Sequence, residues 1–305
     1  MNLSYSQAAL KAFLEIQSSI GLGKVADYIP ALAKADINSF GFAMRTNNGE
    51  EFMLGDAEQP FSIQSISKLL TLVLCLEKDD SILTTRVGIE PSGNPFNSLV
   101  QLEYENGIPR NPFINAGALV ITDSLISHYS DPEKEILIFA RMLSGNSNLN
   151  YNLEVRDSEK ATGFRNVALV NFMKSYGNID NECERVLNCY FTHCSLEMSC
   201  LDLVRTFDFL SRNGQHSSGK SILSYRQNKK VNALLLTCGT YDAVGNFAYK
   251  VGLPAKSGVG GGIVAVIPNE MVLAVWSPGL ERSGNSYAGS LFLEHFTTIT
   301  GKSIF

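Results

Sequence analysis

The feature that most limits how this chain can fold is an apolar segment that directly follows a serine and a lysine. Ser65-Ile-Ser-Lys68 precedes residues 69–76, of which only Thr71 is polar. A helix that is apolar on every side must be buried, and eight residues are far too few to cross a bilayer. We therefore expect a helix in the centre of the molecule, with Ser65 and Lys68 held rigidly at its first turn.

The spacing of Ser65 and Lys68 suits nucleophilic catalysis. Residues three apart on a helix project from the same face, and the unpaired N–H groups at a helix start favour the negative charge of an alkoxide or oxyanion. Burial beside that positive end should lower the pKa of Lys68, and only a neutral lysine can act as a base. A capping serine followed by a lysine that reaches solvent is the simpler interpretation of the same segment.

A second segment, far downstream, completes a recognised pairing. Lys256-Ser257-Gly258-Val259 begins a glycine-rich, strand-like stretch that ends at Ile263. An S-x-x-K serine combined with a distant K-[ST]-G strand is typical of penicillin-recognising serine enzymes. Glycines let a ligand or another backbone come close, so an edge strand here could offer N–H groups to a substrate carbonyl. A glycine-rich turn that enters a hairpin is the alternative interpretation.

A competing S-x-x-K pair, Ser217 and Lys220, lies in the polar run 213–221, which predicts a surface loop. The same run matches the phosphate-binding G-x-x-x-x-G-K-[ST] pattern from Gly214 to Ser221. That pattern binds phosphate only between a buried strand and a helix, whereas here it follows residues with helical spacing. Nucleotide binding is therefore not expected.

The composition of the chain limits the classes of binding partner and the compartment that can be expected. The 305 residues carry a net charge of −5, so there is no basic surplus to neutralise the phosphates of a nucleic acid. The N-terminal residues lack the basic and apolar regions of a secretory signal. The six cysteines are then expected to be reduced thiols in the cytoplasm. Four of them lie between 183 and 200, but without C-x-x-C spacing and with only His193 nearby no metal site is expected.

Strand-like segments lie near both ends of the chain, and helical segments lie between them. Segments 40–54 and 263–276 predict two β-hairpins, the first with a tight primed turn at Asn48-Gly49 and the second across residues 268–270. Helical spacing occurs at 9–16, from Pro132 onward, from Ser195 to Arg212 and at 287–299.

This order of elements predicts an α/β (α+β) fold, with an antiparallel sheet flanked by helices and an inserted helical subdomain. Residues 1–64 and 220–305 are expected to form the α/β subdomain that contains the sheet. Residues 65–219 are expected to form a mostly helical subdomain, with the active site between the two.

Seven longer blocks of sequence carry a resemblance to a known family, and they lie within about residues 20–270. The blocks are Gly23–Pro30, Gln64–Lys68, Glu90–Gly93, Asn111–Ala118, Ser158–Asn166, Cys238–Ala243 and Val251–Ile263. In sequence and in order they resemble the serine-dependent glutaminases. The resemblance implies a β-lactamase/DD-peptidase-like fold, in agreement with hairpins placed around helices. Ser67 and Val244 stand at positions that are expected to vary within such a family.

Roles for individual residues follow from this resemblance. Ser65 resembles the family's nucleophile and Lys68 its base, while Tyr241 and Tyr28 match active-site tyrosines, of which Tyr241 touches substrate and passes protons. No metal or organic cofactor is implied, and the family suggests a homo-oligomer, a tetramer or a dimer. The positions that match substrate-binding residues, besides Ser65 and Tyr241, are Gln64, Asn115, Glu159, Asn166, Tyr190 and Val259.

The implied reaction is hydrolysis of the side-chain amide of L-glutamine to L-glutamate and ammonia through a serine acyl-enzyme. Taken alone, each binding residue has a plainer interpretation: Asn115 as a turn residue, Glu159 as a solvated helix charge, Tyr190 as a core aromatic. Two other functions stay open. One is a penicillin-binding or β-lactam-hydrolysing serine enzyme, against which the lack of an export signal argues. The other is a non-catalytic amino-acid-binding protein on the same fold.

Overall fold

The computed structural model describes residues 3–93 and 98–305. Its centre is a five-stranded antiparallel sheet with the strand order β2-β1-β7-β6-β5. Both ends of the chain build this sheet, as the sequence predicts, and β5 lies at one of its edges. The strands are β1 Gly41–Thr46, β2 Glu51–Gly55, β5 Ala255–Ser257, β6 Gly262–Ile267 and β7 Met271–Trp276.

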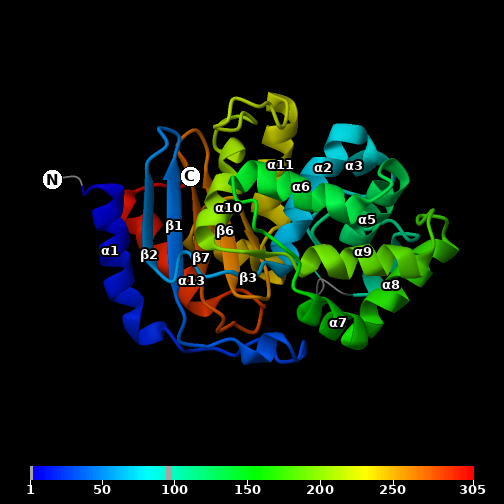
Figure 1. Cartoon of the computed structure of the whole chain (residues 1–305), viewed down its shortest axis with the longest axis horizontal. Coiled ribbons are helices and arrows are strands. Elements are labelled where there is room, and N and C mark those ends of the chain that lie inside the picture. Colours follow the sequence, from blue (N-terminus) through cyan, green and yellow to red (C-terminus); the bar gives the residue numbers. More distant parts are fainter. Residues whose placement is uncertain (1–2, 94–97) are drawn as a thin grey trace.

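Two terminal helices cover one face of the sheet. Helices α1 (Tyr5–Ile16) and α13 (Tyr287–Thr300) pack against each other and lie together beside the sheet in Figure 1. Phe42 of β1 packs against Phe292 and Phe296 of α13 with tilted rings, whose centroids are 4.5 and 5.9 Å apart. Alternate strand residues point to this layer and to the opposite one, so both faces of the sheet are buried.

The opposite face of the sheet meets the helical part of the molecule. Helix α10 (Cys200–Thr206) packs on β1 and β7, and the remaining helices extend away from it (Figure 1). Within this part α2 (Ser67–Lys78) is buried from Ser67 to Leu76. This is the central helix that the apolar segment predicts, and it packs against α5 (Asn115–His128) and α6 (Pro132–Ser144).

The other helices complete the helical part and the connections to the sheet. Helices α7 and α8 both pack on α9, and α11 packs on α12 and β5. A short two-stranded sheet pairs β3 with β4. The bounds are α3 Ile82–Thr85, α4 Val100–Tyr104, α7 Leu153–Thr162, α8 Phe164–Ser175, α9 Cys183–Cys194, α11 Tyr225–Cys238, α12 Val244–Lys250, β3 Phe61–Ser62 and β4 Glu197–Met198.

Two local predictions need correction. The first hairpin closes through three residues, 47–49, because Thr46 pairs with Glu50 and only Gly49 of the loop has a positive φ. A primed two-residue turn would require positive φ at Asn48 as well. The helix expected from Ser195 to Arg212 begins only at Cys200, because Ser199 caps it in a reciprocal capping box with Asp202. It ends at Thr206, before a 3₁₀ turn.

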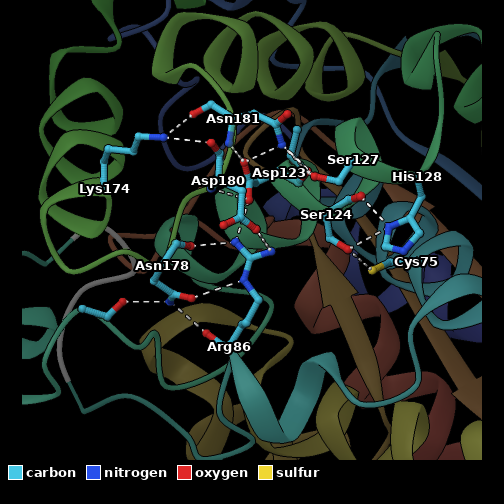
Figure 2. Close-up of polar contacts among 12 residues, drawn as sticks. Cys75, Arg86, Asp123, Ser124, Ser127, His128, Lys174, Asn178, Asp180 and Asn181 are labelled. Atoms are coloured by element: carbon cyan, nitrogen blue, oxygen red, sulfur yellow. Dashed lines mark hydrogen bonds and ion pairs between the residues drawn. The ribbon is translucent and has the colours of Figure 1, made fainter.

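A buried carboxylate fixes the helical part (Figure 2). Asp123 of α5 accepts a bond of 2.6 Å from Arg86. It also accepts backbone bonds of 3.0 Å from Asp180 and 2.9 Å from Asn181, in the segment before α9. These bonds hold the pKa of Asp123 below its ordinary value although burial alone would raise it. One side chain thus joins α5, the end of α3 and the start of α9.

The segment 20–38 runs from the sheet to the helical part along the lower edge in Figure 1. Lys24 forms an isolated bridge with Leu280, next to the sheet. Further along, the Ala31 N–H donates to Ser158 of α7, and Lys34 pairs with Glu154 of the same helix. In the part of the chain described here, no helix is both long enough and apolar enough to span a membrane.

Candidate active site

Ser65 lies in a tight turn at the entrance to α2. Residues Gln64–Ile66 form a 3₁₀ turn, and the α-helix begins at Ser67. Gln64 has a φ of 49°, a left-handed conformation that costs energy for any residue other than glycine. Ser65 is 9% exposed and lines a cavity of about 730 Å³. The strained turn therefore presents a serine to the cavity from an otherwise buried element.

Lys68 is buried one turn along α2 from Ser65. Its Nζ donates 2.6 Å to the Asn115 Oδ1 atom and 3.2 Å to the Phe113 carbonyl. Burial lowers the pKa of Lys68 to about 8, against the attraction of Cys194 and Glu159. The lowered pKa is the effect that the sequence predicts for an amine enclosed at this helix start. About one-tenth of such an amine is neutral at pH 7, and this neutral form is the one that a general base requires.

The Lys256–Val259 segment approaches Ser65 from the sheet. Lys256 and Ser257 are in the edge strand β5 and are fully buried. A Cβ atom at Gly258 would stand 2.4 Å from the Ile63 carbonyl oxygen and 3.3 Å from the Ser65 nitrogen. Only glycine permits this approach, and it places the backbone that leads into Val259 against the serine turn.

Lys256 is a second buried amine on this side. Its Nζ donates to the carbonyls of Gly239 and Ser257, at 3.0 and 2.7 Å, and lies 4.8 Å from the centroid of the Tyr241 ring. Burial, followed by repulsion from Lys68, lowers the pKa of Lys256 far below its ordinary value. The amine supports both the strand edge and the Tyr241 ring.

The two candidate tyrosines differ in their surroundings. Tyr241 has a φ of 59° and is buried against Val259. Burial raises the pKa of Tyr241, while Ser65 and Ser257 oppose that rise, so its hydroxyl remains protonated. Tyr28 lies on the 20–38 segment, is 57% exposed and lines the cavity mouth.

Glu159 of α7 supplies a buried carboxyl group to the cavity. It is 8% exposed, and its Oε2 atom has no hydrogen-bond partner among the described residues. Burial raises the pKa of Glu159 to about 7, while Lys68 and a hydrogen bond from Gln64 oppose that rise. A buried and incompletely paired carboxylate is costly and suits a ligand that brings a positive charge. Glu159 is thus no solvated surface residue.

Asn115, Asn166 and Tyr190 form the remaining wall. Asn115 begins α5 and donates 2.9 Å to Asn166 of α8 while accepting the bond from Lys68. Tyr190 of α9 is 2% exposed and borders the cavity. These residues connect the base to the part of the cavity that holds Glu159.

The structure therefore brings the predicted residues together. Lys68 contacts the cavity wall through Asn115, and Tyr241 does so through Ser65 and Val259. The other predicted residues line the cavity directly, and they are Tyr28, Gln64, Ser65, Asn115, Glu159, Asn166, Tyr190 and Val259.

Sequence reasoning overlooked the polar residues behind the site. Ser67, treated as a variable position, and His193, considered only as a metal ligand, form a buried hydrogen bond of 2.8 Å. The positively charged residues Lys24, Arg165 and Arg282 at the cavity mouth were also not anticipated. Their side chains come from separate segments without a shared motif, so only the fold brings them together.

The competing motifs lie elsewhere. Lys220 is exposed and donates to the Met142 sulfur, and the 213–221 run closes on itself through a bridge between Gln215 and Ser221. All six cysteines are free thiols on helices, and five of them are buried. Within residues 3–93 and 98–305, no cluster of three or more His, Cys, Asp or Glu side chains could hold a metal ion.

The chain is similar to known glutaminases over nearly its whole length. The family model described as glutaminase matches residues 23–305. A glutaminase of Streptomyces coelicolor (strain ATCC BAA-471 / A3(2) / M145) is 54% identical over 291 residues, which are 95% of this chain and 95% of that protein.

Two solved structures share this fold. The probable glutaminase ybaS superposes with a TM-score of 0.92 at 31% identity, over 99% of this chain and 98% of the other. The second is the Bacillus subtilis glutaminase YbgJ in a covalent complex with 5-oxo-L-norleucine, formed by reaction with 6-diazo-5-oxo-L-norleucine. It superposes with a TM-score of 0.88 at 29% identity, over 99% of this chain and all of the other.

Proposed function

Because this chain belongs to the glutaminase family, we propose that it hydrolyses the side-chain amide of L-glutamine to L-glutamate and ammonia. The observation that carries the proposal is a single cavity lined by Ser65 and Val259, with the buried Lys68, whose pKa is lowered, directly behind its wall residue Asn115. The buried carboxyl group of Glu159 in the same cavity supports an amino acid as the substrate.

In the first half of the reaction Ser65 attacks the δ-carbonyl carbon of glutamine. Neutral Lys68 takes the proton of the Ser65 hydroxyl, and the serine oxygen forms a bond to the carbonyl carbon. The N–H groups of Ser65 and Val259 stabilise the oxyanion, and each such donor contributes about 3 kcal/mol in related chemistry. The close contact of Gly258 with the Ser65 turn supports this assignment.

In the second half the C–N bond breaks and the acyl-enzyme is hydrolysed. Tyr241, with Tyr28 as a relay, donates a proton to the departing nitrogen and takes back the proton that Lys68 removed from Ser65, so ammonia leaves and Lys68 is neutral again. Water then attacks the ester: its oxygen, with one hydrogen, bonds to the acyl carbon as the Ser65–carbon bond breaks, and its other proton passes to the Ser65 oxygen. The influence of Ser65 on the pKa of the buried Tyr241 hydroxyl, which requires the two groups to be close, supports this role. The covalent complex of the Bacillus subtilis relative with a diazoketone also favours a nucleophilic mechanism.

Recognition of glutamine uses both charged ends of the amino acid. Glu159 pairs with the α-ammonium group, while Asn166 and Tyr190 donate to the α-carboxylate. Asn115 fixes the positions of Lys68 and Asn166 through its hydrogen bonds with both. A substrate without the α-amino group leaves the Glu159 carboxylate buried and unpaired, which opposes binding. No step requires a metal ion or an organic cofactor.

A cytoplasmic location and a homo-oligomer, either a tetramer or a dimer, belong to the same proposal. Free thiols at all six cysteines favour a reducing compartment, and the family resemblance is the support for the oligomer. Light scattering on the purified protein tests the oligomeric state.

An ammonia-release assay tests the activity. The intact protein should release ammonia from L-glutamine in preference to L-asparagine and to a glutamine analogue that lacks the α-amino group, and γ-glutamyl amides complete the comparison. Ser65→Ala should abolish release while the circular dichroism spectrum and the melting temperature stay unchanged. Full activity in that variant would remove Ser65 from the mechanism, and labelling of Ser65 by a penicillin without glutamine turnover would favour a penicillin-recognising enzyme.

A further inference from the structure

A fully buried histidine links the turn of Ser65 and Lys68 to two neighbouring helices. His193 lies near the end of α9 and is 0% exposed. Its Nδ1 atom is 2.8 Å from the hydroxyl of Ser67, the residue between the candidate nucleophile and base. Its Nε2 atom is 3.1 Å from the hydroxyl of Thr122 on α5. Both ring nitrogens are therefore engaged inside the protein.

Distances favour one arrangement of protons. Thr122 Oγ1 is 2.8 Å from the Ala118 carbonyl and 3.1 Å from His193 Nε2, so we assign the Thr122 hydroxyl proton to the shorter contact, which makes Thr122 the acceptor from His193. The proton of the imidazole is then on Nε2, and Nδ1 accepts the hydroxyl proton of Ser67. Burial, reinforced by Lys68, lowers the pKa of His193 to about 3. The neutral ring therefore accepts a hydrogen bond from Ser67 at Nδ1 and donates one to Thr122 from Nε2.

The same ring contacts the helices that carry the substrate-binding residues. The Tyr190 ring meets the His193 ring edge-on, with centroids 5.2 Å apart and an angle of 83° between the planes. Thr122 lies about two turns along α5 from Asn115, the residue that accepts the Lys68 bond. His193 thus contacts α2 through its hydrogen bond with Ser67, and it contacts Tyr190 through the edge-on packing of the two rings.

We propose that His193 is a positioning residue with two separable effects on the proposed glutaminase reaction. Its bond to Ser67 holds the turn of Ser65 and Lys68 in the reactive geometry, which governs kcat. Its ring holds Tyr190 against the substrate, which governs KM. The inference rests on the proposed function but adds to it, because His193 itself does not touch the cavity.

Three substitutions separate the two effects. His193→Phe keeps a ring against Tyr190 but loses the bond to Ser67, so kcat for glutamine should fall at least tenfold with KM within threefold. His193→Asn places an amide oxygen near the position of Nδ1 and removes the ring. For this variant kcat should stay within threefold, and KM should rise at least fivefold. Ser67→Ala should reproduce the kcat loss of His193→Phe, and the double variant should lose little more.

Ser124→Ala is the matched control. Ser124 is on the same helix as Thr122, is buried, and contacts Cys75 and His128 rather than His193 (Figure 2). Its kcat and KM should stay within twofold of the parent values. The control shows whether loss of any buried hydroxyl on α5 is enough to disturb the reaction.

Steady-state kinetics and melting temperatures decide the outcome. An unchanged kcat in folded His193→Phe and in Ser67→Ala would overturn the proposal. A fall in kcat together with a rise in KM of similar size in every variant would also overturn it, because the two effects would then not be separable. If His193→Phe does not fold, Ser67→Ala alone decides whether the bond governs kcat. Absence of glutamine turnover in the parent protein would instead refute the proposed function, so the two failures are distinguishable.

Discussion

The bond between Asn115 and Lys68 predicts that one isosteric substitution will move the pH dependence of the reaction. Asn115→Asp replaces the amide 2.6 Å from the Lys68 amine with a carboxylate of the same shape. The negative charge favours the protonated amine, which is inactive as a base. The variant should therefore need a higher pH to reach its full rate.

The size of the effect follows from the position of the charge. A carboxylate this close to an amine typically shifts its pKa by about 1–3 units, so the pKa of Lys68 should rise from about 8 by that amount, to about 9–11. At pH 7 about one-tenth of an amine with a pKa of 8 is neutral, and each further unit lowers that fraction about tenfold. At this pH, kcat should thus fall by about 10- to 1000-fold.

The assay is ammonia release from glutamine at saturating substrate between about pH 6 and pH 10.5, a range that contains the parent pKa and most of the interval expected for the variant. The ascending limb of kcat should move to higher pH in Asn115→Asp, so that activity recovers as the pH rises. Asn115→Ala removes the same amide without adding charge. This variant should have a lower kcat, but the ascending limb of its pH profile should not move to higher pH. A profile of Asn115→Asp that is lowered uniformly, parallel to that of the parent, would refute the reasoning.

Three further predictions concern other parts of the structure. Because Glu159 has a pKa of about 7, kcat/KM should fall as the pH drops through that value and the carboxylate that pairs with the α-ammonium group is protonated. Glu159→Gln should raise KM and should abolish this pH dependence of kcat/KM. Gly258→Ala, which forces a Cβ against the Ile63 carbonyl, should lower kcat about 100-fold, as loss of an oxyanion donor does; normal kcat would place the oxyanion elsewhere. Each carboxylate oxygen of Asp123 accepts two hydrogen bonds, so Asp123→Asn places an NH₂ group against two donors. The free energy of unfolding should fall by about 3–5 kcal/mol, measured as a shift of the urea midpoint. Since the folded-state pKa of Asp123 is depressed, its contribution is present at neutral pH and is lost as the pH falls below about 4.

Much of the fold was predictable because its signals are local. The apolar run after Lys68 indicates a buried helix, and the two hairpins near the ends of the chain indicate an antiparallel sheet; both are confirmed. The errors arose where local and tertiary preferences differ. Ser195–Met198 has helical spacing, yet Met198 pairs with Phe61 in a strand, and Ser199 starts the helix through a capping box with Asp202.

The candidate site was predictable to the extent that motifs carry it. Lys68 and Glu159 could be named from the sequence, but whether Glu159 is solvated or buried depends on segments that are far away in the chain. The bond between Ser67 and His193 has no sequence signal, because a hydroxyl and an imidazole 126 residues apart belong to no shared pattern. Similarly, Arg282 reaches the cavity mouth only because the chain returns there after β7.

The contact of Gly258 with the Ser65 turn makes reactivity a measure of whole-chain folding. The serine turn is made early in synthesis, whereas the strand edge that completes it comes about 190 residues later. During synthesis on the ribosome, an electrophile such as a diazoketone should label only chains whose last strands have joined the sheet. A tagged reagent of this kind would count finished molecules in a living cell and ignore misassembled ones.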